Sequence, residues 1–302
     1  MSRVTSLVLV SVGNTRSRIA VARGGGGAGA FANPTIEPSV VVENAEPGAL
    51  EEAVRNAARD LDPERSRALV ASVNDGVLPR IAAALDESGL GVMRLGNGAG
   101  GTVRVPVAMN VEQSATVGVD RLLCVLAASA RSGGSPCAVI DAGTCVTVDF
   151  VDGHGVFQGG AIAPGVALML RSMHQGTAAL PAMEPPRKDD DTSWMSDEAV
   201  KGAMGKNTKQ AMLLGSLNAV RGLVRWQVEK FAEAAGAYPR VIATGGDAPL
   251  LFDPRVGGAG DDLVEHIVPD LQLVGMVAAW GVLEGGPSAS TDEPETEGAE
   301  DE

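Results

Sequence analysis

The chain has 302 residues, of which 45% are hydrophobic and 21% are charged, a composition that excludes a disordered protein and is sufficient for two domains. Its formal net charge of −14 argues against a nucleic-acid-binding surface. The apolar runs fall short of the roughly 18 residues that a membrane-spanning helix needs. We therefore expect no nucleic acid and no membrane among its partners.

The cysteines and the first residues bear on where the protein works. Cys124, Cys137 and Cys145 show neither disulfide nor metal-ligand spacing. The N-terminal residues show no signal-peptide cleavage pattern. Both observations favour a reducing, cytoplasmic location.

The first part of the chain predicts an α/β lobe over residues 1–131. Runs rich in β-branched residues predict strands, and apolar residues at helical spacing predict helices. In chain order we predict strands at 6–12, 17–22 and 40–42, a helix at 49–61, a strand at 67–73, a helix at 78–85, a strand at 92–95 and a buried helix at 119–130. The first two strands form an antiparallel pair.

The second part predicts a similar lobe over residues 132–285, which begins at a break of Ser, Gly and Pro. Strands are predicted at 137–141, 146–151 and 156–158, helices at 166–173 and 209–234, a strand at 241–243 and a helix at 274–283. Residues 286–302 carry seven acidic residues, no basic residue and no large apolar side chain. Such a segment cannot offset its ordering entropy by burial, so we expect a disordered acidic tail.

A glycine turn with a neighbouring hydroxyl group joins the first two strands of each lobe. Gly13-Asn14-Thr15 is the first copy and Asp141-Ala142-Gly143-Thr144 is the second, and a related turn follows a strand at Thr244-Gly245-Gly246. Glycine lets the backbone approach a phosphate closely, and the adjacent Thr or Asn offers donors to its oxygens. Two copies, one per lobe, predict paired lobes that hold a nucleotide in the cleft between them.

Six motifs occur in the order found in type III pantothenate kinases, which the chain resembles from about residue 7 to 283. They are Gly13-Asn14-Thr15, Gly118-Val119-Asp120-Arg121, Asp141-Ala142-Gly143-Thr144, Gly159-Gly160-Ala161-Ile162-Ala163-Pro164-Gly165, Gly205-Lys206-Asn207-Thr208 and Thr244-Gly245-Gly246. The resemblance implies two duplicated ribonuclease-H-like lobes of the actin, hexokinase and Hsp70 type. It also implies a homodimer that phosphorylates pantothenate with ATP, in the first step of coenzyme A synthesis.

The resemblance also implies the roles of individual residues. Asp120 is the expected general base, and the pantothenate contacts are Gly118, Val119, Asp120, Arg121 and Thr208. The expected ATP contacts are Ser11, Val12, Gly13, Asn14, Thr15, Arg16, Ser17, Arg18, Thr144, Gly245 and Gly246. Asp141 is the expected ligand of a monovalent cation, K⁺ or NH₄⁺.

Plain structural roles remain open for the same residues. Asp120 and Thr208 could cap helices, Asp141 could cap a turn, and Arg121 could be a surface residue. Gly159-Gly160 with Pro164-Gly165 is interpreted as a rigid turn that brings backbone close to a ligand.

The sequence departs from the family pattern at two places. Ser11 stands where the family has an aspartate that supports Mg²⁺, so we expect Mg²⁺ to be held weakly. Arg16 and Arg18, on one face of the predicted strand, could supply positive charge instead. Residues 109–116 lack the tyrosine and proline that the family uses near pantothenate. The alternative to an active kinase is therefore a weakened or inactive relative that binds ligands or acts as an accessory protein.

Overall fold

The first half of the chain builds a mixed seven-stranded sheet around β1 (Ser6–Val12) in the computed structural model, which describes residues 4–24, 34–46, 48–186, 204–254 and 263–284. The apolar, β-branched sequence of β1 suits a strand covered on both faces, and all seven of its residues are buried. The other strands are β2 (Arg16–Arg23), β3 (Thr35–Ile36), β4 (Val40–Glu43), β5 (Ser66–Ser72), β6 (Gly91–Gly96) and β7 (Val103–Arg104).

The second half repeats this arrangement in a five-stranded sheet. Its strands are β8 (Cys137–Ala142), β9 (Cys145–Val151), β10 (Phe157–Pro164), β11 (Arg240–Thr244) and β12 (His266–Ile267). Their order, β10-β9-β8-β11-β12, matches β3-β2-β1-β5-β6 in the first sheet. In both sheets the hairpin pairs are antiparallel and the later strands add in parallel. The predicted pair of duplicated ribonuclease-H-like lobes is confirmed.

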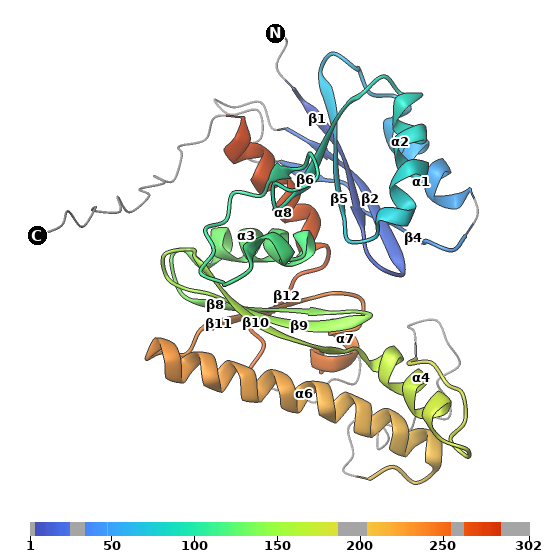
Figure 1. Cartoon of the computed structure of the whole chain (residues 1–302), viewed down its shortest axis with the longest axis vertical. Coiled ribbons are helices and arrows are strands. Elements are labelled where there is room, and N and C mark those ends of the chain that lie inside the picture. Colours follow the sequence, from blue (N-terminus) through green and yellow to red (C-terminus); the bar gives the residue numbers. More distant parts are fainter. Residues whose placement is uncertain (1–3, 25–33, 47, 187–203, 255–262, 285–302) are drawn as a thin grey trace, which may run out of the picture.

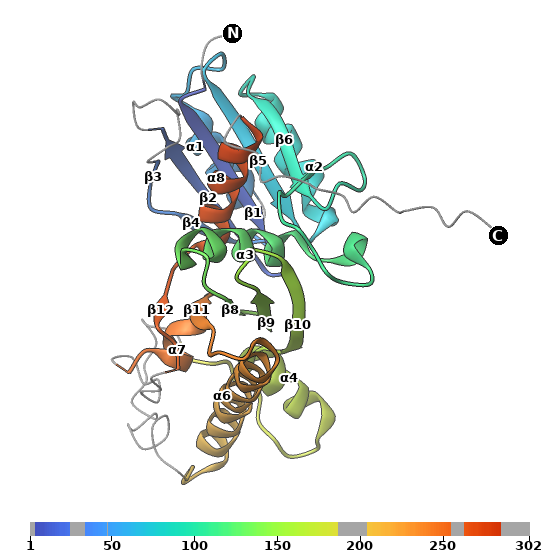
Figure 2. The same ribbon diagram turned by 90° about the vertical axis from the view of Figure 1, so that its left-hand side faces the viewer.

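Helices cover the outer faces of both sheets and fill the space between them (Figure 1 and Figure 2). α1 (Ala49–Ala58) and α2 (Leu78–Asp86) pack on the outer face of the first sheet. α4 (Val166–Gly176), α6 (Thr208–Ala235) and α7 (Ala248–Phe252) pack on the outer face of the second. α3 (Val119–Ser132) and α8 (Leu271–Leu283) lie between the sheets and pack against each other. Short 3-10 turns are η1 (Asp75–Val77) and η2 (Ser114–Thr116).

Strand alternation decides which side chains face the central helices. In β1, Leu7 and Leu9 belong to the core around α3 and α8, whereas Val8 and Val10 belong to the core under α1 and α2. Since alternate residues of a strand share a face, Ser11 also points to the central layer. The same rule in β8 directs Asp141 there, because Cys137 and Val139 pack in the central core.

Most predicted elements are confirmed within one to three residues, but the interpretation of Gly159-Gly160 as a turn is wrong. Both residues lie inside β10, which extends to Pro164, at a register shift between Phe157 and Gly159. A Cβ on Gly160 would clash with the carbonyl oxygen of Val148 in β9, so glycine is needed there for close strand packing. The division at residues 131 and 132 stays a prediction, and the predicted tail 286–302 lies outside the described residues.

Candidate functional site

The tips of the two equivalent hairpins meet at one cavity of about 620 Å³. The hydroxyl oxygens of Thr15, after β1, and Thr144, after β8, lie 3.0 Å apart at hydrogen-bonding distance. Eleven of the residues predicted to hold ligands line this cavity: Ser11, Gly13, Asn14, Thr15, Arg16, Arg18, Asp120, Asp141, Thr144, Gly245 and Gly246. The structure thus brings together motifs that lie up to 235 positions apart in the chain.

The first hairpin tip is held by a network of polar contacts. The Gly13 N–H donates to the carbonyl oxygen of Arg16 at 2.9 Å. Asn44 Nδ2 donates to the carbonyl oxygens of Gly13 and Asn14 at 2.8 and 3.2 Å. Asn44 Oδ1 in turn accepts from the Ser17 hydroxyl at 2.6 Å. These contacts fix the tip in shape before any ligand arrives.

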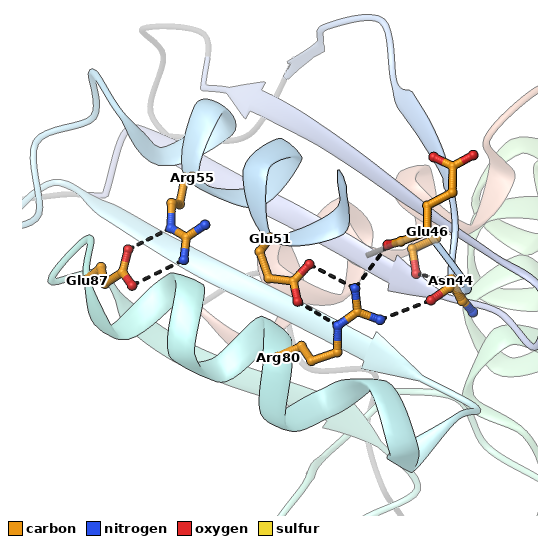
Figure 3. A network of polar contacts seen from close by, with 7 residues as sticks. Asn44, Glu46, Glu51, Arg55, Arg80 and Glu87 are labelled. Carbon is orange, nitrogen blue, oxygen red and sulfur yellow. Dashed lines mark hydrogen bonds and ion pairs between the residues drawn. The ribbon is translucent and has the colours of Figure 1, made fainter. Parts of the chain in front are cut away.

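Arg80 in α2 holds the backbone of Asn44 in place (Figure 3). It donates to the carbonyl oxygens of Asn44 and Glu46 at 3.0 and 3.2 Å and forms a two-point ion pair with Glu51 in α1 at 2.6 and 2.9 Å. The Glu51 partner raises the pKa of Arg80, and Arg80 lowers the pKa of Glu51. A bidentate pair of this kind is geometrically specific. Through it, α1 and α2 fix the loop that contains Asn44, and Asn44 in turn fixes the tip of the first hairpin.

The second hairpin packs closely on the turn after β11. Gly245 has φ +95°, and a Cβ there would clash with the carbonyl oxygen of Ala142. The Asp247 N–H donates to the same carbonyl at 3.0 Å. Only glycine fits this left-handed position against backbone, and both Gly245 and Gly246 line the cavity.

Arg16 and Arg18, the arginines of the first hairpin that line the cavity, already have carboxylate partners. Arg16 Nε lies 2.7 Å from Glu43 Oε1, and an Arg18 terminal nitrogen lies 2.6 Å from Asp270 Oδ1. Asp270 begins α8 with φ +56°, the one left-handed non-glycine residue in the described part of the chain. The two guanidinium groups that could compensate for the missing carboxylate at position 11 therefore line the cavity, and each is already in an ion pair.

A chain of hydrogen bonds between residues that line the cavity joins the two hairpins through α8. The Ser11 hydroxyl donates to Gln272 Oε1 at 2.6 Å, and Gln272 Nε2 donates to Asp141 Oδ2 at 2.9 Å. Burial raises the pKa of Asp141 to about 6, against the lowering effect of the Gln272 hydrogen bond, and the nearby Asp120 carboxylate adds to the rise. Asp141 is thus a carboxylate beside the tip of the second hairpin, and a cation next to it would stabilise its ionised form.

Asp120 lies in the first turn of α3 and lines the same cavity. Its Oδ1 accepts from the backbone N–H of Arg121 at 2.8 Å, and a Cβ on Gly118 would clash with that oxygen. Burial raises the pKa of Asp120, partly offset by the Arg121 N–H. A carboxylate with a raised pKa in a cavity has the properties of a general base.

Arg121 points away from the cavity lining and into the protein. Its guanidinium forms an ion pair with Asp149, whose side chain is 2% exposed, and lies 5.3 Å from the centre of the Phe157 ring. Burial raises the pKa of Asp149, and Arg121 opposes that rise. The pair stabilises the junction of α3 with β9 and occupies the guanidinium that the sequence assigned to a substrate carboxylate.

Six of the predicted contact residues do not line the cavity: Val12, Ser17, Gly118, Val119, Arg121 and Thr208. Val12, Ser17 and Val119 are buried, and Thr208 is exposed at the start of α6. Sequence reasoning missed further lining residues, above all Glu43, Arg171, Glu184, Asp270 and Gln272. No local motif marks them, because each reaches the cavity only through the tertiary fold.

Within the described ranges, no group of three or more His, Cys, Asp or Glu side chains is arranged to hold a metal ion. A cation in this cavity would therefore need other oxygen ligands besides its carboxylates. Among the described residues, no helix is both long enough and apolar enough to cross a bilayer.

Comparisons with known proteins identify the family. A family model described as type III pantothenate kinase matches residues 7–230. The type III pantothenate kinase of Rhodopirellula baltica is 39% identical over 184 residues, which span 61% of this chain and 62% of that protein. The type III pantothenate kinase of Akkermansia muciniphila is 33% identical over 179 residues, 59% of this chain and 66% of that protein. The chain thus matches just under two thirds of the length of these curated relatives.

A solved structure supports the fold. A protein from Campylobacter jejuni, described as a Baf family transcriptional activator, aligns with a TM-score of 0.52 at 14% sequence identity and covers 92% of this chain and 98% of its own. At that identity the likeness concerns the fold alone. With the family model matching most of its length, the chain belongs to the type III pantothenate kinase family.

Proposed function

We propose that this chain transfers the γ-phosphoryl group of ATP to the primary hydroxyl of pantothenate, with Asp120 as the general base. The observation that carries the proposal is the shared cavity. The two glycine hairpins, the Gly245-Gly246 turn and the Asp120 carboxylate all line it. Its volume of about 620 Å³ lies within the range of ligand sites. Family membership supports the same reaction.

In the proposed reaction, Asp120 accepts the hydroxyl proton while the alcohol oxygen forms a bond to the γ-phosphorus. The bond between that phosphorus and the bridging oxygen breaks, and ADP leaves with the electron pair. The chain's contribution is alignment and charge placement. Gly13, Thr15 and Thr144 would offer backbone and hydroxyl donors to phosphate oxygens, and Gly245-Gly246 would lie against the nucleoside.

The donor set fits the cations that the family uses. Asp141 and Asp120 are carboxylates in one cavity, and the pKa of Asp141 is raised by burial, so a bound cation would stabilise its ionised form. Asp141 would hold K⁺ or NH₄⁺, which would neutralise phosphate charge. Mg²⁺ would be held mostly through the phosphates, because Ser11 offers a neutral oxygen.

For the remaining assignments we propose a cytoplasmic homodimer with lobes at 1–131 and 132–285. Gly118, Val119 and Thr208 would contribute to pantothenate binding. Thr208 lies outside the cavity lining of one chain, so its role would need either a movement of α6 or a second chain. Val12 and Ser17 would act on the nucleotide by holding the hairpin in shape.

A coupled assay with ATP, Mg²⁺, K⁺ and pantothenate tests the function, and Asp120→Asn tests the base. We expect turnover in the unmodified protein and a decrease in kcat of about 10²–10⁴-fold in the variant, with ATP binding retained. Because burial raises the pKa of Asp120, the base loses activity by protonation as the pH falls through that pKa.

Asp75→Asn is a suitable control, since Asp75 is an exposed aspartate in the first turn of η1, outside the cavity. It should leave kcat unchanged. Absence of phosphopantothenate at millimolar ATP, with ligand binding intact, would instead support the inactive relative. Retention of full turnover in Asp120→Asn would refute the base assignment alone.

A further inference from the structure

Gln272 lies between the two hairpins at the point where the family's acidic residue is replaced by Ser11. It accepts from the Ser11 hydroxyl at 2.6 Å and donates to Asp141 at 2.9 Å. Ser11 is 5% exposed, so its hydroxyl has little access to water as an alternative partner. Residues of β1, α8 and β8 are thereby joined in one chain of hydrogen bonds.

The direction of both hydrogen bonds is fixed by chemistry. An ionised Asp141 can only accept, so the amide nitrogen of Gln272 must face it and the amide oxygen must face position 11. A serine satisfies that oxygen because a hydroxyl can donate. Ser11 and Gln272 are therefore a matched donor and acceptor, and together they direct an N–H at Asp141.

An aspartate at position 11 would conflict with this arrangement. Its carboxylate would face the amide oxygen of Gln272, acceptor against acceptor, in a position that is almost buried. If the amide turned over, its oxygen would face Asp141 instead. Either orientation leaves one carboxylate without its donor, which is costly for a buried charge.

We propose that Gln272 is a positioning residue that holds Asp141 toward the phosphates, and that Ser11 orients Gln272, so that serine at 11 and glutamine at 272 work only as a pair. The proposal takes its ligand, ATP, from the proposed function. The hydrogen bonds on which it is based do not depend on that function. In this arrangement Ser11 is more than a missing Mg²⁺ ligand, because Ser11 and Gln272 together replace the family's aspartate.

The sharpest test exchanges both positions. Ser11→Asp alone should weaken ATP binding about tenfold in calorimetry with fixed Mg²⁺ and K⁺, because a buried acceptor loses its donor. In the Gln272→Ser background the side chain is short and can donate, so Ser11→Asp should there strengthen ATP binding. In both backgrounds kcat should change with ATP affinity, while the KM for pantothenate stays constant. A gain from Ser11→Asp in both backgrounds would overturn the pairing.

A second cycle does not depend on introducing a charge. Ser11→Ala and Gln272→Leu should each weaken ATP binding several-fold, and the double variant should be no weaker than Gln272→Leu alone, because Ser11 acts through Gln272. Ser11→Thr, which keeps the hydroxyl, should rescue the loss. Additive effects in the double variant, or equal losses in Ser11→Thr and Ser11→Ala, would overturn the proposal.

Gln158→Leu is a matched control because Gln158 makes the same two contacts elsewhere. It accepts from Asn110 Nδ2 at 2.7 Å and donates to Asp152 Oδ2 at 2.7 Å, outside the cavity lining. It should change ATP affinity less than twofold. Since calorimetry needs no pantothenate, the sign reversal can be observed even if pantothenate is not the substrate, and the two proposals fail separately.

Discussion

The hairpin β1–β2 and the hairpin β8–β9 occupy equivalent places in the two sheets but carry opposite chemistry. Ser11 and Asp141 are the matching residues at the strand ends. The first hairpin adds Arg16 and Arg18, whereas the second contributes a half-buried carboxylate, Asp141, whose pKa is raised to about 6. The duplicated topology therefore gives Ser11 and Asp141 equivalent positions, whereas their chemistry differs. The first hairpin offers hydrogen-bond donors to the cavity, and the second offers an acid.

The largest expected effect comes from neutralising the acid. Asp141→Asn keeps an oxygen that can accept from Gln272 but removes the charge that would hold a cation. We expect kcat/KM for ATP to fall about 10²–10³-fold, measured in the coupled assay. Ser11→Ala at the equivalent position should cost tenfold or less.

The same variant should stabilise the fold. The folded-state pKa of Asp141, about 6, lies above that of an unfolded aspartate, so the ionised form costs stability above pH 6 and costs nothing below about pH 4. Removing the charge should raise the free energy of unfolding by about 1–2 kcal/mol at pH 8, allowing for solvent in the cavity. Urea denaturation at pH 4, 6 and 8 measures this. An equal difference at all three pH values would contradict the assigned pKa.

A second prediction separates the two hairpin glycines. A Cβ at Gly13 would lie 2.9 Å from the carbonyl oxygen of Arg16, whereas one at Gly143 would meet nothing closer than 4.0 Å. Gly13→Ala should therefore lower the free energy of unfolding by about 1–2 kcal/mol, and Gly143→Ala by less than about 0.5 kcal/mol.

Calorimetry on the second variant sharpens that comparison. If phosphate approaches the backbone at Gly143, Gly143→Ala should weaken ATP binding although the fold is unaffected. Equal destabilisation of the two variants in urea would show that the hairpins are held alike. Unchanged ATP affinity in Gly143→Ala would place the phosphates elsewhere.

The smallest expected effect concerns the ion pair of Arg18. Asp270→Asn keeps a residue that tolerates the left-handed conformation and an oxygen that can accept from Ser39, which now donates at 2.6 Å. It removes one negative charge from the cavity and releases Arg18. ATP affinity should rise about two- to fivefold at low salt, with a smaller gain at high salt. A loss of affinity would show that Asp270 is needed to orient Arg18.

The sequence revealed the parts of the molecule that depend on local pattern. The runs of β1 and β8 and the glycines after them predicted both hairpins, and the family motifs predicted the fold. Gln272 and Asp270 were missed because their partners, Ser11 and Arg18, lie 261 and 252 positions away. Gly160 was misread as part of a turn because glycine is typical of turns but is also required where two strands approach closely. The roles of the cavity residues stay predictions.

The placement of α8 has a consequence for how the protein is made. The hydrogen-bonded link between the two hairpins needs Gln272, which is synthesised long after both hairpins. A nascent chain that stops before α8 lacks this link and also lacks the helix that packs on α3, so we expect it to bind ATP more weakly than the full chain does. Nucleotide-dependent protection from proteolysis should therefore increase once translation has passed this helix.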